Sequence, residues 1–392
     1  MAVLTAAAGD LDAGEIARAA DYHVELFDDW RKAAARWTGT RPTTPFQDFR
    51  WLGAWYGAFT EVEPLAAVIT DARTLEQAAL LPLVRRTRRG VRTIEFADLD
   101  LTDYNAPLLG PAAPRDAAGA QAMWRELLVA LMRMRGGADL IRLRKLPRDL
   151  DGRPNPLALL EGTFRSAVNG NLVTVGEDFD AWRHSLGRNA RKGFLKSWRV
   201  FSREAQAQFK VVTDAEEASR VMAAMEVQQG ARMQALGLSY SLSDQAYAAF
   251  YRDLVAANLA TGYAVLTALI VGEEVVATLL GIRNGARYVM VRFSNAGEKW
   301  ANCSPGLLVI ERTMEALHAD GVRSFDFGTG NYAYKRKFGV TQLPLLNITK
   351  ALSWRGKPLA LRDRIVREVR SYPRLSARIS RALGTRSIRE EV

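Results

Sequence analysis

The stretch from Asn302 to Gly339 constrains the fold most, because it predicts a helix, a strand and a basic turn in close succession. Ser304 and Pro305 suit the start of a helix, and Gly306 leaves its first turn bare of side chain. Apolar residues then recur at helical spacing, and Asp320-Gly321 ends the run. A helix start of this kind presents free amide groups and the positive end of the helix dipole, which suit a phosphate.

A short apolar strand is predicted next, over residues 324–327, and it carries Asp326. The segment that follows the strand is rich in glycine, tyrosine and basic residues: Gly328, Gly330, Tyr332, Tyr334, Lys335, Arg336 and Lys337. We therefore expect a carboxylate, a flexible turn, two phenols and a cation at one end of the strand. The residues alone leave open an ordinary helix–strand unit with a basic loop.

The combination resembles the C-terminal signature of the tandem GNAT acyltransferases, in the CelD-like branch that is related to the Fem-type peptidyltransferases. In that family a Ser-Pro-Gly helix start precedes a D-x-G-x-G-x-x-x-Y-K-x-x-F element. The matching residues of the second element here are Asp326, Gly328, Gly330, Tyr334, Lys335 and Phe338. The usual GNAT pyrophosphate loop, Q/R-x-x-G-x-G/A, is absent from this chain. The family likeness therefore bears more on the fold than on the acyl donor.

The composition limits the number of domains and the class of protein. Its 392 residues suit two domains, and 48% hydrophobic with 25% charged residues is an ordinary globular composition. Cys303 is the single cysteine, which excludes an internal disulfide and fits a reducing cytoplasm. The three histidines, His23, His184 and His318, are too widely spaced to predict a metal site. We expect a cytoplasmic protein with no signal peptide, no membrane span, no metal and no permanently bound cofactor.

An order of hairpin, strand, helix and strand occurs at 65–143 and again at 263–328. This repeat predicts an α/β chain with two similar domains. The resemblance implies that they are two tandem GNAT-like domains, each a mixed β-sheet flanked by helices. We place them at 1–160 and 161–354, followed by a basic amphipathic helical tail at 355–392. Only the second copy has the Ser-Pro-Gly helix start. It is therefore expected to bind the donor, and the first copy to shape the acceptor side.

The resemblance implies transfer of an acyl group from acyl-CoA, as co-substrate, to an amine. The residues expected to bind the donor are Ser304, Gly306, Leu307 and Leu308 at the helix start, with Phe293 and Ser294 on the strand beside which a GNAT sheet splays open. By resemblance, Lys335 faces the reacting groups or the donor phosphates. Tyr334 is placed to protonate the leaving thiolate.

Three residues are candidates for the general base. Glu226 and Asp326 are the leading carboxylates, and His184 has an ordinary pKa near neutrality. Each has a simpler interpretation. Glu226 is then a solvated charge on a helix, Asp326 a cap of the turn, and His184 a histidine on an exposed basic face. The predicted substrate-binding residues are Asp103, Tyr104, Tyr332 and Arg191. Loop structure alone would explain Asp103 and Tyr104 equally well.

The net charge of +11 is concentrated in residues 181–210 and 355–392. The second segment forms a basic amphipathic pattern, which indicates either contact with an anionic membrane surface or a helix docked on its own domain. A membrane contact favours a lipid amine as acceptor, because one branch of the superfamily resembles bacterial ceramide synthases, which acylate sphingoid bases. A CelD-like enzyme would instead acetylate an amino sugar during exopolysaccharide or cellulose formation.

A third interpretation assigns the basic segment at 181–210 to RNA, either in a tRNA-dependent Fem-type aminoacyl transferase or in a protein that only binds RNA. No RNA-binding motif is visible in the sequence, and no sheet with a stacking platform accompanies the basic residues. Nucleic acid is therefore not a favoured partner.

Overall fold

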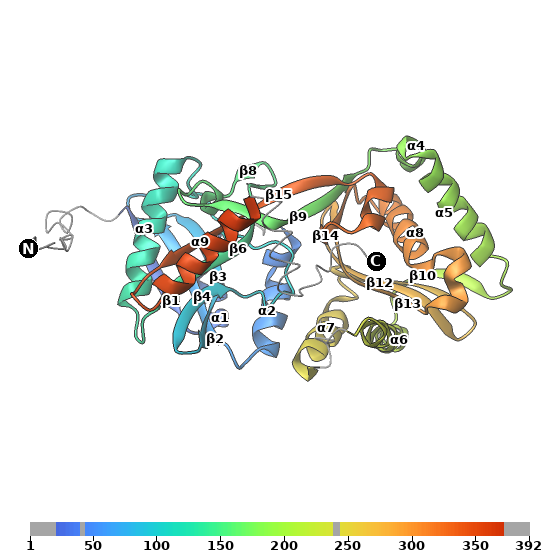
Figure 1. Ribbon diagram of the computed structural model, residues 1–392, viewed down its shortest axis with the longest axis horizontal. Coiled ribbons are helices and arrows are strands. Elements are labelled where there is room, and N and C mark those ends of the chain that lie inside the picture. Colours follow the sequence, from blue (N-terminus) through green and yellow to red (C-terminus); the bar gives the residue numbers. More distant parts are fainter. Residues whose placement is uncertain (1–20, 40–43, 238–243, 372–392) are drawn as a thin grey trace, which may run out of the picture.

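The computed structural model describes residues 21–39, 44–237 and 244–371. Two halves of similar architecture share one 13-stranded sheet, and helices cover both of its faces (Figure 1). The predicted fold class, a mixed α/β chain with two tandem GNAT-like units, is confirmed. Residues 372–392 of the predicted tail lie outside the described residues. Among the helices of the described residues, none has the length and apolar content needed to cross a bilayer.

The N-terminal half contains the first copy of the repeated order. Its elements are β1 (Tyr22–Phe27), α1 (Trp30–Arg36), the 3-10 helix η2 (Pro45–Gln47), α2 (Phe49–Ala58), β2 (Glu63–Asp71), β3 (Gln77–Arg88), β4 (Val91–Phe96), β5 (Leu108–Leu109), α3 (Ala117–Arg133) and β6 (Leu140–Pro147). Strands β1 to β4 pair antiparallel in sequence order, whereas β4 and β6 pair parallel. The aromatic stripe of α2 packs into the core through Trp51, Trp55 and Phe59, which are buried.

The C-terminal half repeats this order. Its elements are β10 (Ala207–Val212), α6 (Ala215–Ala235), α7 (Gln245–Asn258), β11 (Ala264–Val271), β12 (Glu274–Asn284), β13 (Arg287–Asn295), η5 (Glu298–Cys303), α8 (Pro305–Ala319), β14 (Ser324–Thr329) and η6 (Ala333–Phe338). Strands β10 to β13 pair antiparallel, and β13 pairs parallel with β14. Apart from the short β5, the two halves therefore match strand for strand, and the predicted duplication is confirmed.

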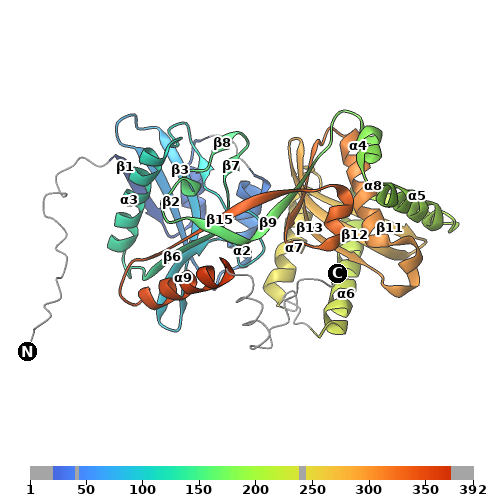
Figure 2. The same cartoon turned by 45° about the horizontal axis from the view of Figure 1, so that its top comes forward.

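Two long strands join the halves by exchange. β9 (Phe164–Thr174) follows the N-terminal half in sequence but pairs with β14 of the C-terminal half. β15 (Thr341–Ala351) follows the C-terminal half but pairs with β6 of the N-terminal half, and it also pairs with β9. Both strands run from one half to the other (Figures 1 and 2). The limits 1–160 and 161–354 remain a proposal, because β15 returns to the first half.

Short elements connect the two halves. Residues 148–170 contain the hairpin of β7 (Asp149–Leu150) and β8 (Arg153–Pro154), the short helix η3 (Pro156–Ala158) and the start of β9. The basic segment at 181–210 begins with two helices, α4 (Phe179–Ser185) and α5 (Arg188–Phe201). They are separated because Leu186 is extended and buried in the same core as Phe338.

The segment after β15 is fastened to the N-terminal half by Asp139. The backbone amides of Leu352 and Ser353 donate to the Asp139 carbonyl, and the Ser353 hydroxyl donates to its carboxylate at 2.6 Å. Arg92 forms an ion pair with the same carboxylate at 3.0 Å, which holds its pKa well below the usual range. α9 (Lys357–Ser371) begins directly after this contact. The described part of the tail is therefore a helix docked on its own half.

Gly356 makes this contact possible, because a Cβ at this position would overlap the carbonyl oxygen of Asp139. We expect Gly356→Ala to destabilise the protein by about 1–3 kcal/mol, the usual cost of overpacking. Gly53→Ala is the matched control, since Gly53 lies in α2 with open space around its Cβ position. It should stabilise the protein by about 0.5–1 kcal/mol. Denaturant unfolding of both variants checks this, and equal stabilities would contradict the contact.

Candidate active site

Strands β13 and β14 diverge in the C-terminal half, and the place beside the start of α8 where they part is called the opening here. They pair only from Arg287 to Val289 of β13, so residues 290–295 have no partner strand on that side within the described chain. The α8 start faces this opening: a Cβ added to Gly306 would lie 3.3 Å from the Asn295 amide nitrogen and 3.6 Å from the Phe293 ring. Gly306 and Phe293, two of the predicted donor-binding residues, are therefore adjacent.

The α8 start has no side-chain cap. Ser304 occupies the cap position, as predicted, but its backbone is left-handed (φ 46°) and its side chain makes no capping hydrogen bond. The amides of Leu307 and Leu308 donate to the Ser304 carbonyl, and the Leu308 side chain is buried in the core. The Gly306 amide, also in the first turn, has no acceptor among the described residues. This amide is the group free to meet an anion.

The other predicted residue on β13, Ser294, is committed to a buried network. Its hydroxyl lies 2.6 Å from the Gln228 side-chain oxygen and 2.7 Å from the Thr278 hydroxyl. The neighbouring Gln229 donates to the Phe293 carbonyl at 2.9 Å. Helix α6 thus fixes the end of β13 through two consecutive glutamines, and this holds the opening in place.

The turn at the end of β14 is held by residues from two distant segments. Asp103, in the loop after β4, accepts hydrogen bonds from the amide and the hydroxyl of Thr329. Asn171 of β9 donates to the carbonyls of Gly328 and Gly330, each at 2.8 Å. Gly328 has a φ of 67°, and a Cβ there would overlap the Asp103 carboxylate. The N-terminal half therefore holds the glycine turn that the sequence motif contains.

Asp326 is buried beneath this turn and fully bonded. Its carboxylate accepts hydrogen bonds from the Tyr104 hydroxyl at 2.7 Å, the Arg287 guanidinium at 2.7 Å and the Gly328 amide at 2.8 Å. Burial and the neighbouring Asp326 carboxylate raise the pKa of Tyr104 well above its ordinary value. The arrangement makes Asp326 the centre of a link between the halves and leaves it poorly placed to accept a substrate proton.

Lys335 lies buried beside the turn, only 2% exposed. Its ammonium group donates to the Thr329 carbonyl at 2.7 Å and to the Gly328 carbonyl at 3.4 Å. Burial lowers the pKa of Lys335 from 10.5 to about 8, and the nearby carboxylates of Asp103 and Asp326 partly oppose this shift. Lys335 therefore titrates close to physiological pH.

Two tyrosines connect Lys335 with the opening. The Tyr332 ring lies 5.3 Å from the Lys335 ammonium and stacks on the Tyr334 ring at 6.1 Å. The Tyr334 ring in turn packs against Phe293 at 5.6 Å. Burial raises the pKa of Tyr334, so its phenol stays protonated at neutral pH. A chain of contacts thus runs from Gly306 through Phe293 and Tyr334 to Lys335.

Three predicted site residues lie outside this cluster. Glu226 on α6 pairs with Arg252 at 3.3 Å, and its Oε1 is buried without a hydrogen-bond partner among the described residues. His184 is exposed on α4, where its ring contacts the Asp180 carbonyl at 2.7 Å. α4 packs along the later turns of α8, with Phe179 against His318, which places it away from the Gly306 end. Arg191 lies in the first turn of α5.

Sequence reasoning missed Arg287, Thr329 and Asn171. Thr329 lies inside the motif, but its role depends on Asp103, which is 226 residues away in the chain. Arg287 pairs with Asp326 only because β13 and β14 run parallel in that register. Asn171 lies within β9, and no motif of the sequence singles it out.

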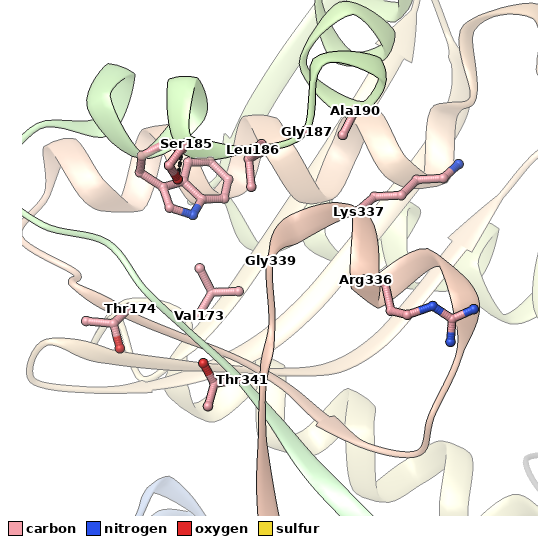
Figure 3. A pocket seen from close by; sticks show the side chains of 11 residues that line it. Val173, Thr174, Ser185, Leu186, Gly187, Ala190, Arg336, Lys337, Gly339 and Thr341 are labelled. Carbon is pink, nitrogen blue, oxygen red and sulfur yellow. Dashed lines mark hydrogen bonds between the residues drawn. The ribbon is translucent and has the colours of Figure 1, made fainter.

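Two cavities lie near the joining strands. One, of about 590 Å³, lies between the halves and is lined by Tyr104 and Arg287, with Arg148, Asp149 and Asp151 at its edge. The other, of about 460 Å³, lies below the junction of α4 and α5. Figure 3 shows the Arg336 and Lys337 side chains extending away from Val173 and Thr174 in that cavity. No group of three or more metal-ligating side chains occurs in the described chain.

The duplicated strand order, the splayed strands and the bare helix start define a tandem GNAT fold. Residues 188–336 match the model of the GNAT acetyltransferase domain family. This match confirms the predicted enzyme class, a GNAT-type acyltransferase. A search of curated proteins found no match.

Solved structures resemble the chain at low identity. A crystal structure of FemX is 12% identical over 82% of this chain and 96% of its own, with a TM-score of 0.53. A conserved protein of unknown function from Bacteroides thetaiotaomicron VPI-5482 is 9% identical over 84% and 100%, with a TM-score of 0.51. A tandem GNAT protein from the clavulanic acid biosynthesis pathway is 12% identical over 84% and 99%, with a TM-score of 0.45. At such identities the likeness concerns the fold.

The link through Tyr104 should contribute measurably to stability. Tyr104→Phe removes a donor from the buried Asp326 carboxylate, and we expect a loss of about 1–3 kcal/mol in the free energy of unfolding. Tyr332→Phe is the control, because Tyr332 is 40% exposed, and it should change stability by less than about 0.5 kcal/mol. Denaturant unfolding monitors both variants. Equal stabilities would show that Tyr104 does not support Asp326.

Proposed function

We propose that the protein is an N-acyltransferase that moves an acyl group from a CoA thioester to an amine, with the donor bound by the C-terminal half. The observation that supports this most directly is the contrast between two equivalent helix starts. α3 of the N-terminal half is capped by the Asp116 carboxylate, which accepts from the Gly119 amide at 2.8 Å. A carboxylate there repels a phosphate, whereas the α8 start carries the bare Gly306 amide.

In the N-terminal half, paired side chains fill the place where β4 and β6 part. In the N-terminal half, Lys145 of β6 forms an ion pair with Asp98 at 2.8 Å, and Asn105 donates to the same carboxylate. The Asn105 amide also bonds to the Lys145 carbonyl, so the loop after β4 runs along β6. The cavity at this place holds only about 20 Å³. This filling supports assigning the donor to the second copy and a supporting role to the first.

The residues of the cluster suit the steps of acyl transfer. The amine nitrogen forms a bond to the thioester carbonyl, the C–S bond breaks, and a proton passes from the amine to a base. The Lys335 cation stabilises negative charge that develops on the carbonyl oxygen or the thiolate. Tyr334 gives its phenol proton to the leaving thiolate and regains the proton that the base took from the amine, so that a free thiol leaves. Of the two leading carboxylates, Asp326 is fully bonded, whereas Glu226 lies outside the cluster and keeps one oxygen without a partner in the described chain.

We propose a lipid amine of the sphingoid type as the acceptor, with residues 355–392 in contact with an anionic membrane. The basic amphipathic segment supports this acceptor. An amino sugar is the alternative, and it is supported by the charged lining of the cavity between the halves, where Arg148, Asp149 and Asp151 suit a polar molecule. Tyr104 and Arg287 line that cavity and bind Asp326, so its occupant lies close to the cluster.

Binding of the donor is tested at Gly306. We expect CoA to raise the melting temperature of the wild-type protein, and Gly306→Glu to abolish this shift because a carboxylate then faces the donor phosphates. Gly193→Glu is the matched control, since Gly193 is an exposed helical glycine with open space around it. It should retain the full shift. A shift in Gly306→Glu equal to that of the control would contradict the donor site.

The same assay separates the acceptor hypotheses through the acyl chain. Palmitoyl-CoA should stabilise the protein more than acetyl-CoA if the product is a lipid amide. Equal stabilisation would contradict the lipid acceptor and favour the amino sugar. Transfer of a labelled acyl group to sphinganine or to glucosamine then identifies the acceptor class.

The role of Lys335 predicts a pH dependence. Its folded-state pKa is about 8, below the ordinary 10.5, so the ammonium is lost as the pH rises through 8. We expect kcat/KM of the wild type, divided by that of Lys335→Arg, to fall above pH 8, because arginine keeps its charge. The ratio cancels ionisation of the acceptor amine. A ratio that stays constant from pH 7 to 9.5 would show that the Lys335 cation is not required.

A further inference from the structure

α9 presents an apolar face that nothing in the described chain covers. Leu361 and Ile365, one helical turn apart, are 56% and 53% exposed. Trp354, just before the helix, is 73% exposed and is the most exposed aromatic side chain of the described residues. Figure 2 shows α9 along the outer surface of the N-terminal half, beside β6 and β15. Exposed large apolar groups clustered on one element indicate an interaction surface.

The orientation of this face is fixed by contacts on the opposite side of α9. Asp363 accepts a hydrogen bond from Arg142 of β6 at 2.8 Å and another from Thr349 of β15 at 3.3 Å. Arg367 lies over the Phe164 ring at 5.3 Å. The charged residues of α9 that could pair with the sheet are thus turned inward. Leu361 and Ile365 consequently point outward on a helix that is already docked.

The surroundings of the apolar face are basic. Arg355, Lys357, Arg362 and Arg364 are exposed, and none of them forms an ion pair within the described chain. Glu368 is the exposed carboxylate of α9, while Asp363 is paired inward. Long cationic side chains beside leucine, isoleucine and tryptophan match the boundary between anionic head groups and acyl chains. A nucleic acid would use the cations but would leave the aliphatic side chains without a partner.

We propose that α9 binds an anionic lipid surface through Trp354, Leu361 and Ile365, with the four exposed cations at the level of the head groups. This inference deepens the membrane contact of the proposed function by naming the face that makes it. It does not require acyl transfer, because the surface is formed by the folded chain alone. Lipid binding and CoA binding therefore test separate claims.

Sedimentation with vesicles of phosphatidylcholine and phosphatidylglycerol (3:1) measures the binding of the full-length protein without acyl-CoA. We expect binding to these vesicles and much weaker binding to pure phosphatidylcholine. The double variant Leu361→Ser/Ile365→Ser should lower the partition coefficient at least about tenfold, since two aliphatic groups no longer enter the interface. The control Leu75→Ser/Val227→Ser removes two side chains that are each 72% exposed elsewhere, and it should leave binding unchanged.

A label at the face shows whether α9 itself enters the lipid. The single native cysteine, Cys303, is buried, so Ile365→Cys creates one accessible site for an environment-sensitive fluorophore. We expect its emission to shift to the blue on anionic vesicles, and a label at Val227→Cys to remain unchanged. Sedimentation without a response at position 365 would overturn the inference, as would absence of sedimentation. A response to protein concentration without vesicles would indicate self-association instead and would also overturn it.

Discussion

The buried carboxylate of Asp326 is the interaction on which the arrangement of the site depends. Tyr104 reaches it from a loop of the N-terminal half, and Arg287 reaches it from the adjacent strand. A buried charge is stable only when it is paired and hydrogen-bonded, so the two halves cannot separate here without exposing or orphaning it. Because the Gly328 amide donates to the same carboxylate, the turn that carries the Lys335 contacts is fixed as well.

The exchange of β9 and β15 gives this interaction its geometric setting. Each half contributes one strand to the other, and the result is a continuous sheet rather than two sheets joined by a linker. Asn171, on β9, therefore bonds directly to the carbonyls of Gly328 and Gly330. The first copy has filled its own opening with the Asp98–Lys145 pair and places Asp103 and Tyr104 against the second. Duplication has thus produced one open unit and one unit that supports it.

The sequence predicted the features that depend on residues close together in the chain. The periodic apolar patterns predicted the helix and the strand of the 302–339 stretch and the order of hairpin, strand, helix and strand that repeats. The Ser-Pro-Gly start and the Asp326-to-Phe338 element identified the fold class and placed Gly306, Tyr334 and Lys335 in one region. Partners that act across the halves could not be predicted, because no spacing rule links Asp103 with Thr329 or Asn171 with Gly328. The strand exchange was missed for the same reason, since pairing between distant strands leaves no local pattern.

The charge state of Lys335 depends on contacts that several other residues hold in place. Burial lowers the pKa of Lys335 to about 8, and the nearby carboxylates of Asp103 and Asp326 oppose this shift. Its ammonium group also donates to the carbonyls of Thr329 and Gly328. Those carbonyls are aimed by the glycine turn, the turn is bonded to Asp103 and Asn171, and Asp103 belongs to the other half. The charge state of the cation is therefore a property of the assembled pair of halves. The C-terminal half without its partner half would keep Asp326 and both carbonyls but would lose Asp103, one of the two carboxylates that raise the pKa of Lys335.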